Sequence, residues 1–198
     1  MPVLAAVPVK RFGVAKRRLA PLLSSEARAA LGRDLAARTL TRLAETGADV
    51  LTLAADEEVA SWSAEHGWEA MVDTGTGLDA AAAGAVARTV RQDRAWMVVH
   101  ADLPLLSLEE ATDAVAAASQ GAVIAPSDDG GTSLLAGKGS FSFAYGPGSF
   151  HRHLSRLDQP RVITATGWLL DLDGPDDLLA VLRHPRGAWL AEYAGPSP

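Results

Sequence analysis

Cysteine is absent from this chain of 198 residues. Its absence excludes disulfides, thiolate metal sites and cysteine nucleophiles, and it fits a reducing compartment. No uninterrupted apolar stretch reaches the ~18 residues that a membrane-spanning helix needs. The short apolar run near the N-terminus precedes its charges, which is not the order of a signal peptide. We therefore expect a soluble, cytoplasmic protein with no membrane partner.

Acidic residues are absent before Glu26, and lysine is rare, with three lysines beside 15 arginines. Five cations lie between Lys10 and Arg18, and Lys10 and Lys16 are two of the three lysines. The preceding apolar run, 3–9, predicts a buried strand, and open α/β sheets bind anionic ligands just past strand ends. Lysine is a compact point charge suited to phosphate oxygens. The segment therefore favours a triphosphate site, although charge alone also fits a solvated, basic helix start.

The overall charge is mildly acidic, at −6 with a pI near 5.3. Because nucleic-acid binding usually needs a basic face or a high pI, the local cationic cluster indicates a small anionic ligand and no nucleic acid. The apolar fraction of 48% is enough for a buried core. The length suits one domain over residues 1–198, with a peripheral tail from about residue 184.

Strand-like and helix-like segments alternate through the first two thirds of the chain. The apolar patterns and caps predict strands and helices in alternation. The expected strands are 3–7, 49–54, 69–72, 95–99 and 122–125, and the expected helices are 24–45, 57–66, 78–92 and 107–119. Repeated β-α units of this kind predict an α/β fold in which a mostly parallel sheet is covered on both faces by helices.

The pattern changes after Pro126. Segments 132–136 and 140–144 are typical of strands that pair around the glycines at 137–139. A helix over 149–157 follows, and then strands over 161–164 and 168–172. Pro175 begins a last helix that extends to about Leu182.

Three aspartates follow predicted strands. Asp102 comes just after the apolar strand 95–99 and needs a partner, because apolar segments flank it. Asp171 and Asp173 share one face of an extended segment, where two carboxylates repel each other unless a cation lies between them. With Asp102 they supply three oxygen ligands suited to Mg²⁺. Two alternatives stay open: Asp102 could bind turn amides, and Asp173 could cap the helix that begins at Pro175.

Two glycine-containing loops suit close approach of a ligand. Segment 127–133 holds two glycines and Thr132, whose hydroxyl and N–H are available for binding. Segment 146–149 leads into a predicted helix and forms a backbone nest suited to phosphate. Each is also the composition of an ordinary turn.

Two further patterns suggest cofactor sites, and neither is favoured. Segment 75–80 fits G-x-G-x-x-A, but it lies in the third β-α unit, so a loop that holds a nucleoside near Gly77 fits better than a nicotinamide site. His151 and His153 are two apart in a predicted helix and point to different faces. His100 is expected to pack at a strand end.

Taken together, these residues resemble a known family over about residues 3–182. The chain is similar to the 2-phospho-L-lactate and phosphoenolpyruvate guanylyltransferases of coenzyme F420 biosynthesis. The matching segments are 7–10, 15–19, 77–78, 101–105, 125–132, 143–150 and 171–178. The resemblance implies the three-layer α/β/α fold of MobA-like nucleotidyltransferases. It also implies transfer of GMP from GTP to the phosphate of phosphoenolpyruvate or 2-phospho-L-lactate, with release of pyrophosphate.

The resemblance implies catalytic and metal-binding roles for charged residues. Lys10 and Lys16 would contact the anionic substrates and, with Asp102, form the catalytic group. Asp102, Asp171 and Asp173 would hold Mg²⁺ as the cofactor.

The resemblance also implies substrate-binding roles for small residues. Thr132, Gly146 and Ser149 would receive the phosphate and carboxylate of the acceptor, a small phosphorylated three-carbon acid. Lys16 and Gly77 would bind the nucleotide. The product would pass to a downstream transferase of the same pathway by a transient contact.

Two departures from the family pattern and several alternatives stay open. Similar proteins often have Asn where this chain has Asp79 and Ser133. The alternatives are a related nucleotidyltransferase with a molybdopterin or sugar-phosphate acceptor, a nicotinamide-dependent oxidoreductase, and a non-catalytic anion-binding module. The residues themselves do not decide between phosphoenolpyruvate, 2-phospholactate and 3-phosphoglycerate as the acceptor, and they do not establish a preference for guanine.

Overall fold

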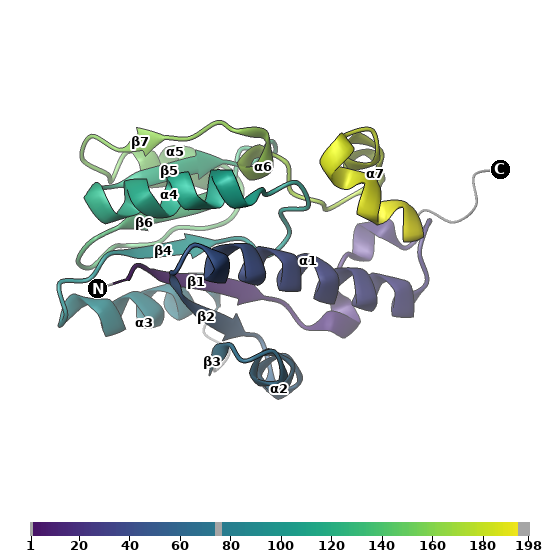
Figure 1. The fold of residues 1–198 in the computed structure, drawn as a ribbon, viewed down its shortest axis with the longest axis horizontal. Helices are drawn as coiled ribbons and strands as arrows, with labels where there is room; N and C mark the ends of the chain where they lie inside the picture. Colours follow the sequence, from purple (N-terminus) through teal and green to yellow (C-terminus); the bar gives the residue numbers. More distant parts are fainter. Residues whose placement is uncertain (1, 74–76, 194–198) are drawn as a thin grey trace.

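The computed structural model describes residues 2–73 and 77–193. Within them, a single seven-stranded sheet has the order β3-β2-β1-β4-β6-β5-β7 (Figure 1). Adjacent pairs are parallel except at β6, which is antiparallel to both β4 and β5. The predicted mostly parallel sheet is therefore confirmed.

The strands and helices alternate along most of the chain. The strands are β1 Leu4–Val9, β2 Asp49–Ala54, β3 Glu69–Val72, β4 Trp96–Val99, β5 Val123–Pro126, β6 Thr132–Gly137 and β7 Arg161–Val162. The α-helices are α1 Ser25–Glu45, α2 Glu57–Glu65, α3 Leu78–Val90, α4 Leu108–Gln120, α5 Ser149–Leu154, α6 Thr166–Leu169 and α7 Pro175–Leu182. The described residues also form the 3₁₀ segments η1 Phe12–Val14, η2 Arg17–Leu19 and η3 Pro185–Glu192.

Alternation along the strands divides the core into two layers. In β1, Ala5 and Val7 pack on the face covered by α1 and α4, whereas Leu4 and Ala6 pack on the face covered by α3. This follows from the two-residue repeat of a strand, which sends successive side chains to opposite faces. Helices on both faces give the expected three-layer α/β/α arrangement (Figure 1).

Local caps explain why the long helices begin where the sequence predicts. The Ser24 hydroxyl accepts a hydrogen bond from Ala27 N at 3.1 Å, at the start of α1. At α4, Ser107 Oγ accepts from Glu110 N while the Glu110 carboxylate accepts from Ser107 N, which is a capping box.

Two predicted strands are absent from the described residues. Segment 140–144 does not pair with β6, because Phe141 and Phe143 pack against Trp96 and the segment bonds to α5 instead. Segment 168–172 begins inside α6, and Leu172 N then donates to Asp102 O at 3.0 Å rather than to a neighbouring strand.

The segment from 184, expected to be peripheral, instead closes a third apolar cluster. η3 buries Leu190 in a cluster with apolar side chains of α1 and α7. Gly187 lies so close to the backbone of Val181 that a Cβ would collide with it. Residues 194–198, at the end of this tail, are outside the described range.

The chain direction places several loops at one edge of the sheet. β1, β4 and β5 end there, and the antiparallel β6 begins there at Thr132. The loops that carry the candidate residues are thus adjacent. No helix in the described ranges is long and apolar enough to cross a membrane.

Candidate active site

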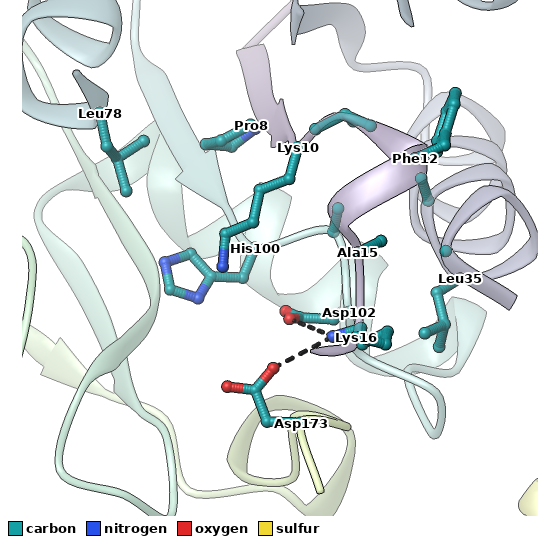
Figure 2. Close-up of a pocket in the computed structure, with 14 residues that line it drawn as sticks. Pro8, Lys10, Phe12, Ala15, Lys16, Leu35, Leu78, His100, Asp102 and Asp173 are labelled. Atoms are coloured by element: carbon teal, nitrogen blue, oxygen red, sulfur yellow. Dashed lines mark hydrogen bonds and ion pairs between the residues drawn. The ribbon is translucent and has the colours of Figure 1, made fainter. Parts of the chain in front are cut away.

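A cavity of about 130 Å³ opens at this edge of the sheet (Figure 2). Its walls come from β1 and the basic loop, from α1, and from the loop after β4, with Leu78 on one side. The charged or titratable side chains that line it are Lys10, Lys16, His100, Asp102 and Asp173. We call these five residues, together with the neighbouring Asp171, the charged cluster.

Lys16 is the centre of the charged cluster. Its Nζ lies 2.7 Å from Asp102 Oδ2 and 3.2 Å from Asp173 Oδ1, and Figure 2 shows it between the two carboxylates. Its backbone has φ 50° and ψ 42°, a left-handed conformation that is uncommon for residues other than glycine. This conformation, between η1 and η2, accompanies the burial of the lysine side chain among the carboxylates.

Mutual attraction keeps both members of the Lys16–Asp102 pair charged. Burial favours the neutral form of each, but the carboxylates of Asp102 and Asp173 outweigh it and raise the pKa of Lys16. Burial likewise opposes ionisation of Asp102, yet the charge and hydrogen bond of Lys16 hold the pKa of that carboxyl well below its usual range. The pair is therefore a fixed dipole at neutral pH.

Lys10 has a different position from Lys16. It is exposed, lines the cavity, and its side chain extends toward His100 (Figure 2). A flexible ammonium group at the mouth of the cavity is placed to meet an incoming anion.

The residues that converge are not the three aspartates expected to hold a metal ion. His100, Asp102 and Asp171 each offer a ligand atom, and these atoms lie within 4.8 Å of one another. Asp173 is outside this group, and its carboxylate forms an ion pair with Lys16. Nor does Asp173 cap α7: the Asp177 carboxylate accepts from Asp173 N at 2.9 Å and from Gly174 N at 2.6 Å.

Asp171 is a carboxyl of the charged cluster whose ionisation is opposed by its surroundings. Burial, followed by the charge of Asp102 and other acidic neighbours, raises the pKa of Asp171 to about 8. The imidazole of His100 is kept neutral, because burial lowers its pKa. Its Nε2 is buried and finds no hydrogen-bond partner in the described part of the chain. His100 was expected to pack at a strand end, and it instead faces the cavity beside the acids.

A second, uncharged group of polar side chains lies at the start of β6. Thr132 Oγ1 lies 3.1 Å from Ser149 Oγ and 3.0 Å from His153 Nδ1. All three side chains are buried. We call Thr132, Ser149 and His153 the neutral triad. Of the predicted acceptor residues, Thr132 and Ser149 are thus in contact, whereas sequence reasoning considered His153 only as half of a poor metal pair.

The loop before α5 closes on itself more than a phosphate nest would. Gly146 adopts φ 106° and Gly148 φ 68°, so glycine is required at both turns. Ser149 N donates to Gly146 O at 3.0 Å, and Phe150 N donates to Gly130 O at 3.4 Å. Since these amides have partners, they do not form an open nest for a phosphate.

The two departures from the family pattern have structural explanations. Asp79, in the first turn of α3, accepts a hydrogen bond from Tyr145 N at 2.8 Å, so its carboxylate ties α3 to the loop before α5. The Ser133 hydroxyl donates to the carbonyls of Ala125 and Pro126 and therefore faces β5, away from the acceptor residues.

Gly77 and the 127–133 loop complete the predicted set. Gly77 adopts φ 86° as the N-cap of α3. Residues 74–76, which include Gly75 of the G-x-G-x-x-A pattern, lie outside the described residues. In the other loop, the Asp129 carboxylate accepts from Ser127 Oγ at 2.6 Å and from Gly131 N at 2.8 Å, which is an ordinary local turn.

Known structures share this architecture. A nucleotide-diphospho-sugar transferase structure from Desulfovibrio desulfuricans G20 superposes with a TM-score of 0.75 at 20% identity, covering 96% of this chain and 93% of that one. A nucleotidyl transferase from Methanothermobacter thermautotrophicus superposes with a TM-score of 0.56 at 15% identity, covering 96% and 99%. These similarities establish the nucleotidyltransferase type of fold.

Sequence comparison then identifies the family. Residues 3–194 match the family described as "Guanylyl transferase CofC like". A phosphoenolpyruvate guanylyltransferase of Rubrobacter xylanophilus is 34% identical, over 90% of this chain and 92% of its own. A 2-phospho-L-lactate guanylyltransferase of Methanothermobacter thermautotrophicus is 28% identical, over 98% and 90%. The chain belongs to the CofC-like guanylyltransferase family, which confirms the resemblance and disfavours the nicotinamide and anion-binding alternatives.

Proposed function

We propose that this protein transfers GMP from GTP to the phosphate of phosphoenolpyruvate or 2-phospho-L-lactate and releases pyrophosphate, as a step of coenzyme F420 biosynthesis. The observation that carries the proposal is the adjacency of the charged cluster and the neutral triad at one sheet edge, in a chain of the CofC-like family. The first suits a polyphosphate and the second a small acid.

The reaction needs no general base. A phosphate monoester is largely dianionic at pH 7, since its second pKa is about 6, so it is already a nucleophile. Its oxygen attacks the α-phosphorus of GTP, the bond from that phosphorus to the β-phosphate oxygen breaks, and pyrophosphate leaves. The barrier lies in bringing two polyanions together and in aligning them.

Lysines at the site reduce this repulsion. The exposed ammonium of Lys10 is placed to meet the triphosphate as it enters. Lys16 already forms ion pairs with Asp102 and Asp173, so phosphate oxygens would share or replace these carboxylate partners. Gly77, at the start of α3, would lie beside the nucleoside.

The donor set fits a divalent cation. The carboxyl groups of Asp102 and Asp171 converge with a neutral imidazole, and burial, followed by the charge of Asp102, raises the pKa of Asp171, so a nearby cation would favour its ionised form. Asp102 and Asp171 would hold Mg²⁺, with Asp173 reached by release of Lys16 and with His100 alongside. When bound, Mg²⁺ would neutralise phosphate charge and orient the leaving pyrophosphate.

The acceptor would bind at Thr132, Gly146 and Ser149, where buried hydroxyl groups and a glycine turn receive its anionic groups. Phosphoenolpyruvate is favoured because relatives bearing that name include chains from Rubrobacter xylanophilus and Sphaerobacter thermophilus, at 34% and 32% identity. We also propose a transient handover of the product to the next transferase of the pathway, because a diphosphate linked to an enol or 2-hydroxy acid is a reactive donor.

Phosphorus NMR tests the reaction itself. The protein would be incubated with GTP, Mg²⁺ and phosphoenolpyruvate. We expect two mutually coupled signals from a new mixed diphosphate, together with one equivalent of pyrophosphate. GDP and inorganic phosphate alone would contradict the proposal, since they would indicate hydrolysis rather than transfer.

A further inference from the structure

His153 is buried at the back of the neutral triad, and nothing in the reaction as described above uses it. We propose that His153 is a positioning residue: it fixes the direction of the hydrogen bonds through Thr132 and Ser149, so that one hydroxyl proton faces the anionic group of the acceptor. The inference rests on the proposed acceptor site. It concerns which way protons point rather than which residues touch the substrate.

The tautomer of His153 follows from a backbone contact. Ala144 N lies 2.9 Å from His153 Nε2, and a backbone N–H can only donate. Nε2 must therefore carry the lone pair. In a neutral imidazole the proton is then on Nδ1, which lies 3.0 Å from Thr132 Oγ1 and donates to it.

The surroundings keep this imidazole neutral. Burial lowers the pKa of His153 to about 4, and the positive charge of Arg156 adds to the effect. The rings of Phe141 and Tyr145 pack against it, with centroids 5.8 and 4.8 Å away. His153 is thus a donor of one fixed direction at neutral pH.

The direction of the hydrogen bond between His153 and Thr132 decides whether a hydroxyl proton remains for the ligand. Thr132 and Ser149 together hold two, and the Thr132–Ser149 contact of 3.1 Å uses one. If His153 Nδ1 donates to Thr132, the other proton stays free for a ligand. If Nδ1 instead accepted, Thr132 would give its proton to the imidazole and Ser149 would give its own to Thr132. The pair would then offer only lone pairs, which repel a carboxylate or phosphate.

Two variants separate the positioning role from a structural one. The amide of His153→Asn reaches the position of Nδ1, so it can donate to Thr132 but not accept from Ala144. The amide of His153→Gln reaches the position of Nε2, so it can accept from Ala144 but leaves Thr132 without its donor. His151→Asn, at an exposed position two residues away, is the matched control.

We expect His153→Gln to raise the KM for phosphoenolpyruvate up to about tenfold, because Thr132 loses the donor that fixes where the free hydroxyl proton points, and the hydrogen bond to the charged acceptor is then no longer held in place. The KM for GTP should stay unchanged. His153→Asn should remain within about threefold of the parent, because it restores the donor. If Asn harms the acceptor KM more than Gln, His153 serves only to hold the loop at Ala144, and the proposal is overturned.

A spectroscopic measurement on the unmodified protein applies even where a variant folds poorly. The ¹⁵N chemical shifts of the His153 ring should show a protonated Nδ1 and an unprotonated Nε2 at pH 7. A protonated Nε2 would overturn the proposal.

Failure of the acceptor site itself has a separate signature. If Ser149→Ala and Thr132→Val leave the KM for phosphoenolpyruvate unchanged while turnover persists, the acceptor binds elsewhere and the inference falls with that site. If these two variants raise that KM and His153→Gln does not, the site is right and the role of His153 is wrong.

Discussion

The charged cluster and the neutral triad lie at the same edge of one sheet but are built in opposite ways. In the charged cluster Lys16 is shared by two carboxylates, and burial, followed by the charge of Asp102, raises the pKa of Asp171 to about 8. In the neutral triad, buried side chains without charge are joined by hydrogen bonds of 3.1 and 3.0 Å. Charge can gather and neutralise polyanions, whereas directed hydroxyl groups can distinguish one small acid from another.

The largest effect is expected from Asp102→Asn in the charged cluster. It removes one carboxylate of the Lys16 pair and one of three groups placed to share a cation. We expect kcat to fall about 10³-fold, measured as pyrophosphate release. Asp113→Asn, at an exposed position on α4, should behave as the parent. A fall of less than tenfold would show that the cluster is not the catalytic centre.

Asp171→Asn should lower turnover and, at higher pH, raise the free energy of unfolding. We expect turnover to fall about 10²-fold at a fixed Mg²⁺ concentration. The folded-state pKa of about 8 lies above the unfolded value, so the carboxyl stabilises the fold least at high pH. Without metal, the variant should therefore gain in free energy of unfolding relative to the parent as pH rises from about 4 to about 8. Denaturant titrations at several pH values measure this, and a difference that shrinks with pH would refute the assignment.

Lys10→Met tests whether the exposed lysine acts on the ligand rather than on the fold. We expect the KM for GTP to rise about tenfold, an effect that salt should weaken. The melting temperature should not change. Arg11→Met is the neighbouring control, because Arg11 faces Asp56, 3.5 Å away. Equal effects of the two variants would reduce Lys10 to a contributor of general positive charge.

The smallest effect is expected from a substitution at Asp79, which ties α3 to the loop before α5. Asp79→Asn keeps an oxygen for Tyr145 N but removes a negative charge near the expected nucleotide site. We expect the KM for GTP to fall about two- to threefold, with the acceptor KM unchanged. A rise in both values would mean that the carboxylate charge itself holds the loop before α5.

The sequence predicted those parts of the molecule that depend on local signals. The caps at Ser24 and Ser107 and the two-residue alternation in β1 are read within a few positions, and α1, α4 and the sheet followed from them. Lys16 and Asp102 were also predictable as neighbours, because strand ends collect at one edge. Their direct ion pair was not.

The parts that escaped prediction depend on contacts between distant segments. The antiparallel insertion of β6 between β4 and β5 brings Thr132 to α5, and segment 140–144 then packs its rings on Trp96 instead of forming a strand. One signal was available: Ser149 and His153 are four apart, one helical turn, and so share a face. No local sequence pattern predicts the ion pair between Asp173 and Lys16, which are far apart in the chain.

Pyrophosphate release with GTP and Mg²⁺, measured with phosphoenolpyruvate, 2-phospho-L-lactate and 3-phosphoglycerate in turn, tests the central claim most directly. We predict release with phosphoenolpyruvate, abolished by EDTA and absent when ATP replaces GTP. No release with any acceptor, from protein that still binds GTP, would contradict the assigned reaction.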